Sequence, residues 1–123
     1  FPFYGGCVEY CTEVETKAGT VEIEIPEYYA ALLHVELDEK QADVFAEPYT
    51  ARFEKVAAGV HSLRLTAYGT RINTFGQLHN CNRKEEYYGP KSYRTSGKNW
   101  SYVYQLRQTG VTVAPIVRVL EEK

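Results

Sequence analysis

The segment V-H-S-L-R-L-T-A-Y, residues 60–68, decides the fold because it is the most regular alternating stretch of the chain. Leu63, Leu65 and Ala67 share one face, and Ser, Arg and Thr side chains occupy the other. A period of two is typical of a β-strand with one buried face. The sequence therefore predicts a strand here, and the turn that ends at Gly59 sets its start.

Other short segments of the chain predict strands in the same way. Ala30–Leu37 places Leu33, Val35 and Leu37 on one face, and the polar turn at residues 38–40 follows it. We expect further strands at Cys7–Val14, Thr20–Ile25, Gln41–Ala46, Tyr49–Phe53, Trp100–Leu106 and Val111–Leu120, the last bent at Pro115. Short strands with turn signals at about 8 to 12 residue spacing are typical of an all-β sandwich or barrel. No helix-period pattern of useful length is present.

Two stretches interrupt the strand pattern. The first, Y-G-T-R-I-N-T-F-G-Q-L-H-N at residues 68–80, reads as a wide loop in which Phe75 and Leu78 close the end of the sheets. The second, Asn82–Asn99, has no apolar periodicity. A loop of this length in a compact domain is usually functional or packed by its own side chains. In the strand expected after it, Tyr102 and Tyr104 should be core residues.

Bulk composition limits the class of protein. With 123 residues and 44% hydrophobic content, the chain is expected to form one domain, residues 1–123, with its own core. A net charge of −2 with mixed signs gives no electrostatic case for nucleic-acid binding. The longest apolar run, Tyr28–Leu33, is far too short to cross a membrane.

The start of the chain suggests a larger parent protein. The chain contains no Met and opens on Phe1–Tyr4, which is aromatic and would ordinarily pack against something. We therefore expect a fragment cut from a longer multidomain protein, with an upstream domain close to these residues.

The three cysteines do not form an obvious framework. On one extended strand Cys7 and Cys11 lie roughly 13 Å apart, beyond the disulfide range of about 4.4 to 6.8 Å, and also too far apart to share one zinc ion. At most one of them could bond Cys81. The resulting odd thiol favours a reducing compartment such as the cytoplasm. No metal ligand is predicted, although His79 is a suitable type.

Catalytic chemistry finds no support in the sequence. Glu22 and Glu24 share a strand face about 6.6 Å apart, close to the spacing of glycosidase carboxylates. Acids that alternate with Val and Ile on a strand are far more often a solvated face. No nucleophile elbow, phosphate-binding loop or metalloprotease motif is present. The chain itself is therefore predicted to have no catalytic residue.

Several motifs carry a resemblance to a known kind of module. Pro48–Thr50, the turn at residues 57–59 and the H-S-L-R-L-T strand resemble galactose-binding-like jelly-roll domains of bacterial glycoside hydrolases. F-Y-G-G (3–6), N-T-F-G-Q-L-H-N (73–80), Y-Y-G-P-K-S-Y-R-T (87–95) and W-S-Y-V-Y-Q-L (100–106) look like the carboxy-terminal β-sandwich of glycosidase-like proteins, including relatives of α-L-rhamnosidases. The likeness covers nearly the whole chain. The chain has Asp38–Glu39 and Gly59–His61 where such domains often carry N-G and G-x-N.

The resemblance implies an all-β jelly-roll sandwich that acts as a non-catalytic accessory module. Such a module binds carbohydrate, packs on the catalytic domain of the same polypeptide, or does both. These folds sometimes hold a structural calcium, but no run of acidic ligands identifies its site here. No other cofactor is implied. The alternative is a purely structural interdomain module without a ligand, whose residues 1–4 dock on a neighbouring domain.

The sequence offers two groups of carbohydrate-binding candidates. Asn73, Gln77, His79 and Asn80 could bond sugar hydroxyls, but the asparagines could equally hold the backbone of a wide turn. Sugar rings stack on exposed aromatic faces, and Tyr87 and Tyr88 lie outside any strand pattern. Arg94 could then orient hydroxyl groups. The predicted site residues are Tyr87, Tyr88, Arg94, His79, Asn80 and Asn73.

Overall fold

The structure, a computed structural model, describes residues 1–121. The chain divides into two compact units. The strand unit consists of Cys7–Gly69 and the chain from Thr109 onward, and the loop unit consists of Phe1–Gly6 and Thr70–Gln108. The expectation of one domain over residues 1–123 stays a prediction.

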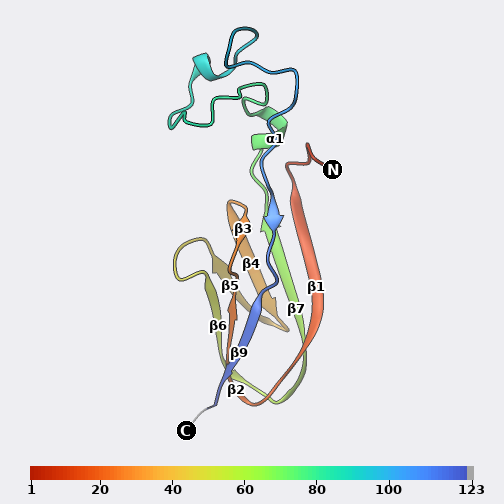
Figure 1. The fold of residues 1–123 in the computed structure, drawn as a ribbon. Coiled ribbons are helices and arrows are strands. Elements are labelled where there is room, and N and C mark those ends of the chain that lie inside the picture. Colours follow the sequence, from red (N-terminus) through yellow and green to blue (C-terminus); the bar gives the residue numbers. More distant parts are fainter. Residues whose placement is uncertain (122–123) are drawn as a thin grey trace. The chain divides into compact units, whose positions relative to one another are not determined.

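All the strands of the described residues belong to the strand unit (Figure 1). They are β1 (Cys7–Thr16), β2 (Gly19–Glu24), β3 (Tyr28–Tyr29), β4 (Leu32–Leu37), β5 (Lys40–Val44), β6 (Thr50–Val56), β7 (Gly59–Tyr68), β8 (Gly110–Val111) and β9 (Ile116–Leu120). The loop unit contains only one short helix, α1 (Ile72–Phe75), and a 3₁₀ turn, η1 (Pro90–Ser92), within the described chain.

The strands form three antiparallel sheets. The first has the order β1-β7-β4-β5, the second β6-β2-β9, and the third is the short pair β3-β8. Residues 60–68 lie in β7, an inner strand of the first sheet, where Leu65 is opposite Tyr10 on one side and Val35 on the other. The prediction of an all-β fold is confirmed.

One hydrophobic core joins the two larger sheets. In β4 and β7 every second side chain is buried, as the alternation predicted. The buried apolar residues are Val21, Ile23, Ile25, Leu33, Val35, Leu37, Val44, Ala51, Phe53, Val56, Leu63, Leu65 and Ala67. A core of this kind supplies most of the favourable free energy of folding.

The first strand is longer and more exposed than its pattern predicted. β1 extends to Thr16, and the strand itself is confirmed. The expectation of one buried face is wrong for most of its length, because Val8 and Tyr10 are exposed and Val14 is only half-buried. The physical reason is position: β1 lies at the edge of its sheet, where the opposing layer covers it poorly.

The strand predicted at Trp100–Leu106 is wrong. Only an isolated bridge links Trp100 to Asn80, and no regular strand follows. Tyr102 is 85% exposed and Tyr104 is 52% exposed, so neither is a core residue. The Tyr102 ring packs on Trp100, and the Tyr104 ring packs on His79 and Phe3. These ring contacts lie within the loop unit and involve no sheet.

Two smaller predictions also need correction. The final strand is interrupted: β8 and β9 are separated by residues 112–115, which include Pro115. Phe75 does not plug a sheet end, since it is 67% exposed and lies in helix α1. The predicted loop at residues 68–80 thus contains a helical turn that the hydrophobic periodicity of the sequence did not predict.

Candidate functional site

The loop unit is built around the side-chain amide of Asn73, which lies on α1 and is 3% exposed. Its Nδ2 donates to the carbonyl oxygen of Arg107 at 2.7 Å. The backbone N–H of Arg107 donates back to Asn73 Oδ1 at 2.8 Å. These paired bonds fasten the returning segment to the helix, so Asn73 mainly holds Arg107 in place.

A second amide, Asn80, organises the long loop. Its Oδ1 accepts the backbone N–H of Asn82 at 2.9 Å, and its Nδ2 donates to the Glu85 carboxylate. The other oxygen of Glu85 accepts the hydroxyl of Ser92 at 3.0 Å, and Ser92 is fully buried. This chain of bonds fixes the loop between residues 80 and 92 without a sheet.

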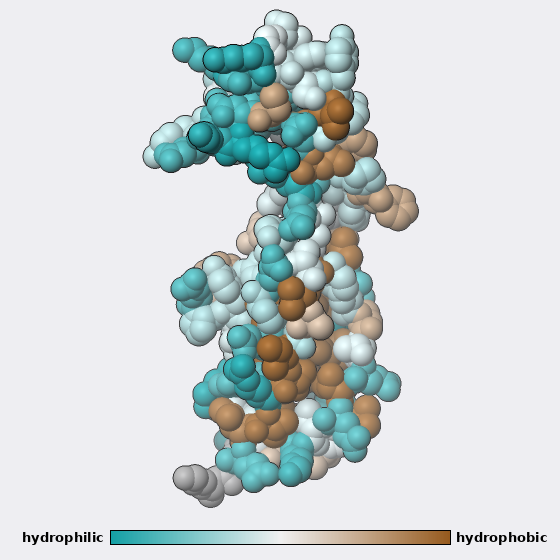
Figure 2. All heavy atoms as spheres, in the orientation of Figure 1, coloured by the Kyte–Doolittle hydropathy of each residue, from teal (hydrophilic) through white to brown (hydrophobic). Residues whose placement is uncertain are grey.

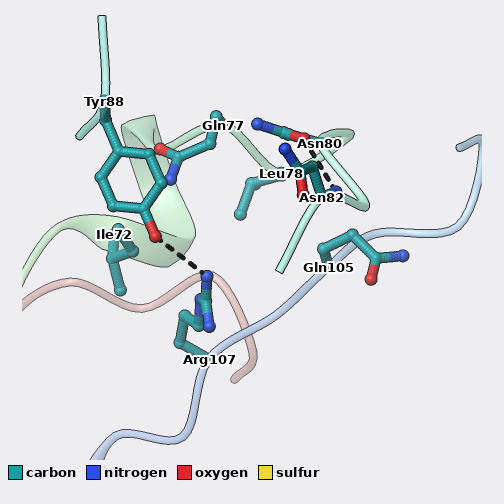
Figure 3. A pocket seen from close by; sticks show the side chains of 8 residues that line it. All are labelled: Ile72, Gln77, Leu78, Asn80, Asn82, Tyr88, Gln105 and Arg107. Carbon is teal, nitrogen blue, oxygen red and sulfur yellow. Dashed lines mark hydrogen bonds between the residues drawn. The ribbon is translucent and has the colours of Figure 1, made fainter. Parts of the chain in front are cut away.

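A polar hollow lies between these two fixed points (Figure 3). Its enclosed part is small, about 10 Å³, which is room for one water molecule. The lining residues come from α1, the loop after it, the Tyr88 loop and the returning segment: Ile72, Gln77, Leu78, Asn80, Asn82, Tyr88, Gln105 and Arg107. A larger ligand would therefore lie across the mouth of the hollow.

Tyr88 and Arg107 form the most distinctive part of the lining. Arg107 donates through an Nη to the Tyr88 hydroxyl at 3.4 Å, as the dashed line in Figure 3 marks. The Tyr88 side chain remains 51% exposed, and Gln77 lies beside its ring in Figure 3. A ring held by its hydroxyl and open on a face can stack against an apolar ring surface.

The hollow is lined mainly by side chains that form hydrogen bonds. Four amide side chains, those of Gln77, Asn80, Asn82 and Gln105, offer both donors and acceptors, and Arg107 adds donors. The lining contains no Asp, Glu, His or Cys. It therefore presents hydrogen-bonding groups without a carboxylate, an imidazole or a thiol.

His79 faces a different set of neighbours. Its Nδ1 donates to the carbonyl oxygen of Ser101 at 2.8 Å. Its ring stacks at a tilt between Trp100 and Tyr104, with centroids 5.8 and 5.0 Å away. This placement ties His79 to the aromatic cluster and away from the hollow.

The other predicted site residues are dispersed within the loop unit. Tyr87 is 87% exposed and does not line the hollow. The Arg94 Nε is buried and makes no hydrogen bond with the described residues, and Arg94 does not line the hollow either. Of the six predicted residues, Asn80 and Tyr88 meet at the hollow, and Asn73 supports its wall from behind. Their binding role stays a prediction.

Cysteine and metal chemistry are simple in the described chain. Cys11 and Cys81 form no disulfide within the described chain, and Cys7 and Cys11 are exposed. A hydrogen bond to the Glu9 carboxylate raises the pKa of the Cys11 thiol. Within residues 1–121 no three His, Cys, Asp or Glu side chains gather closely enough to hold a metal ion.

The paired carboxylates of β2 are cross-strand ion-pair partners. Glu22 lies 3.2 Å from an Arg52 Nη on β6, and Glu24 lies 2.6 Å from an Arg118 Nη on β9. Each acid is therefore paired with an arginine of a neighbouring strand, which agrees with a solvated sheet face.

No helix in the described chain has the length and apolar character that crossing a membrane requires.

Sequence reasoning missed Asn82, Gln105 and Arg107 as lining residues. Gln105 and Arg107 were hidden because the aromatic alternation of residues 100–106 indicated a strand. The density of amide side chains between residues 73 and 82 was the available signal, although Asn73, Asn80 and Asn82 all bond backbone groups of the loop unit. A partner segment near residue 105 could not be inferred without the fold.

Comparisons with known proteins place no constraint on this site. A scan against protein families, a search of curated proteins and a search of solved structures each returned no match to the chain.

Proposed function

We propose that the chain is a non-catalytic, carbohydrate-binding accessory module of a glycoside-hydrolase-like protein, with a galactose-binding-like jelly-roll fold. Two antiparallel sheets around one core support the fold assignment. The observation that carries the function is the hollow, where an exposed Tyr88 ring stands beside four amides and an arginine. Sugars present apolar ring faces and many hydroxyl groups, which this combination complements.

Binding would place a sugar ring against Tyr88 at the mouth of the hollow. The amides of Asn82 and Gln105 would bond hydroxyl groups, and Arg107 would donate from the floor. Asn80 and Asn73 would act mainly by positioning these groups. Tyr87, Arg94 and His79 would contribute only to a longer glycan that extends beyond the hollow. Because the site is shallow and buries little ligand surface, a single sugar should bind weakly.

A glycan array probed with the 123-residue chain is the direct test. We expect binding to a restricted set of glycans and a loss of about tenfold or more in affinity for Tyr88→Ala, equivalent to about 1.4 kcal/mol. Tyr102→Ala is the matched control, because Tyr102 is an exposed tyrosine of the same unit outside the hollow. Absence of binding to any glycan, or equal effects of both substitutions, would contradict the proposal.

A second candidate is a structural module that docks on the catalytic domain of its parent. The favouring observation is an aromatic surface of the loop unit: Phe1 is fully exposed, and Phe3 packs edge-on against the half-exposed Tyr104 at 5.0 Å. Such exposed aromatics are enriched at protein interfaces. Phe3→Ser with Tyr104→Ser should then lower the melting temperature of the parent enzyme and leave glycan affinity unchanged. The reverse pattern would favour the carbohydrate site alone.

The compartment follows from the thiols in this proposal. Cys11 is an exposed thiol outside any disulfide, which is better suited to a reducing environment and supports the expectation of a cytoplasmic protein. No cofactor is proposed.

A further inference from the structure

The strand unit contains an open apolar groove that the proposed carbohydrate site does not use. Its volume is about 320 Å³. One wall is formed by inward side chains of β1 and β7, among them Tyr10, Thr12 and Leu65. The other is formed by β8, β9 and the segment that joins them, among them Val113, Pro115 and Val117. Figure 2 shows apolar side chains at the surface over the strands of this unit.

The groove lies at the open side of the two larger sheets. β5 and β6 contact each other and close one side. β1 and β9 are the opposite edge strands of the two sheets, and residues of both line the groove. The core is therefore covered at one edge and accessible at the other.

β1 also has a free backbone edge. Its ten residues pair with β7 over the full length of the strand. From Val8 to Thr16, no backbone hydrogen bond reaches β1 from a described segment other than β7. Every second N–H and C=O of β1 consequently points away from the sheet. A long unpaired edge of this kind can accept an additional strand.

The outward face of β1 is acidic. Glu9 is 3.6 Å from Arg64, whereas Glu13 and Glu15 lie opposite the uncharged Ser62 and Val60. Neither Glu13 nor Glu15 makes an ion pair within residues 1–121. Two carboxylates on one strand face thus lack a compensating cation beside an unpaired edge.

We propose that β1 is the docking edge for an extended segment of a partner protein whose side chains alternate between apolar and basic. The segment would pair with the β1 backbone as an added strand. Its apolar side chains would enter the groove beside Tyr10 and Thr12. Its Lys or Arg side chains would emerge on the outer face, spaced at about 6.6 Å like Glu13 and Glu15.

A second copy of the chain is a poor occupant of the same edge. If two β1 strands paired antiparallel with Thr12 opposite Thr12, Glu9 of each copy would lie opposite Glu15 of the other. A shift that places Cys11 opposite Cys11 would instead put Glu9 opposite Glu13. Like charges directly opposite each other on neighbouring strands are destabilising, so the charge pattern favours a basic partner.

The test uses the 123-residue chain and labelled nine-residue peptides with blocked ends. The probe alternates Val and Lys, one control alternates Val and Glu, and a second control has the composition of the probe with all Lys residues in one block. We expect fluorescence anisotropy to show saturable binding of the probe and at least tenfold weaker binding of both controls. Equal binding of the three peptides, or no binding of the probe, would overturn the proposal.

Two variants connect the binding to the proposed edge. Glu13→Lys with Glu15→Lys should lower the affinity for the Val–Lys peptide at least tenfold and raise the affinity for the Val–Glu peptide. A misfolded protein could not produce this reversal of charge preference. Val113→Asp should lower the affinity for the Val–Lys peptide because it places a charge in the groove. Since Val113 is an exposed residue outside the strands, the variant should still fold. If the chain sediments as a dimer that the probe cannot dissociate, a second copy holds the edge and the proposal fails.

Discussion

At the scale of single residues, His61 shows how one side chain fixes a turn. His61 is buried on β7, and its Nδ1 donates to an Asp38 carboxylate oxygen at 2.6 Å. Its Nε2 donates to the carbonyl oxygen of Ala57 at 2.9 Å. Both partners only accept hydrogen bonds, so both ring nitrogens carry a proton and the imidazole is charged. Asp38 itself has a positive φ of 52°, which these bonds help to hold.

The same contacts shift both ionisations. The Asp38 carboxylate first, and then the Ala57 carbonyl, raise the pKa of His61 above its ordinary value of 6.5. The hydrogen bond from His61, and next the one from the Ser62 backbone N–H, lower the pKa of Asp38 below 3.8. The stabilisation by His61 is complete below pH 6.5 and is lost as pH rises through the raised pKa. That by Asp38 is complete above pH 3.8 and is lost as pH falls through the lowered pKa.

A thermal-melting series from pH 5 to pH 9 checks this linkage. We expect the wild-type chain to lose stability as pH rises above 6.5 towards the raised pKa of His61, because over that interval the folded state holds a proton that the unfolded state has released. His61→Gln should be less stable at pH 5 and should lack that loss. His34→Gln serves as the histidine control. Parallel pH profiles for the wild type and His61→Gln would contradict the assignment of a charged His61.

Sequence alone indicated the candidate site only in part at this scale. Asn80 and Tyr88 were identified because amides and exposed aromatics are the residue types that bind sugars. Whether an amide can bind a ligand depends on the hydrogen bonds that it already makes. Both polar atoms of the buried Asn73 side chain are hydrogen-bonded to the Arg107 backbone. Asn73 and Arg107 lie more than thirty residues apart in the sequence, so this pairing can be identified only from the folded structure.

At the scale of elements, periodicity predicts strands well where a sheet is present to receive them. β4 and β7 have the burial that their sequences predict. Residues 100–106 have a similar alternation, but their aromatic rings find partners in His79 and Phe3 and no neighbouring strand. Alternation thus reports a two-sided environment, and the sequence does not say whether a sheet or a ring cluster provides it.

A pair of glycines tests the packing of β2 against β9. Gly19 and Gly59 both start strands with positive φ, 150° and 142°. A Cβ added at Gly19 would collide with the backbone carbonyl of Leu120, whereas one at Gly59 would meet nothing within 4 Å. Both alanine variants should be destabilised by backbone strain of about 1–3 kcal/mol. Gly19→Ala should lose more stability than Gly59→Ala, because β9 must also shift to make room for the added Cβ.

Urea denaturation of the two glycine variants measures the difference directly. The shared backbone strain makes Gly59→Ala a matched control, so the excess loss in Gly19→Ala reports the contact with Leu120. Equal losses of stability in the two variants would show that β9 does not hold this position against β2.

At the scale of the whole molecule, composition and strand spacing predicted an all-β chain correctly. The division into a strand unit and a loop unit was not foreseen, because the aromatic motifs of residues 87–106 were interpreted as a return to the sheets. The hydrogen bonds of Asn73, Asn80 and Glu85 show how a segment without strands can still be ordered. Side-chain networks of this kind have no periodic signature in a sequence.

Side-chain NMR can test whether the hollow of the loop unit binds carbohydrate, as we propose. The NH₂ groups of Gln77, Asn80, Asn82 and Gln105 give their own signals in a ¹⁵N-labelled chain. On titration with a glycan selected from the array, we predict that these signals shift together and saturate with a Kd on the order of millimolar, and that Tyr88→Ala weakens the response. If these amide signals stay unchanged while the glycan binds elsewhere, or if no glycan shifts them, the account is contradicted.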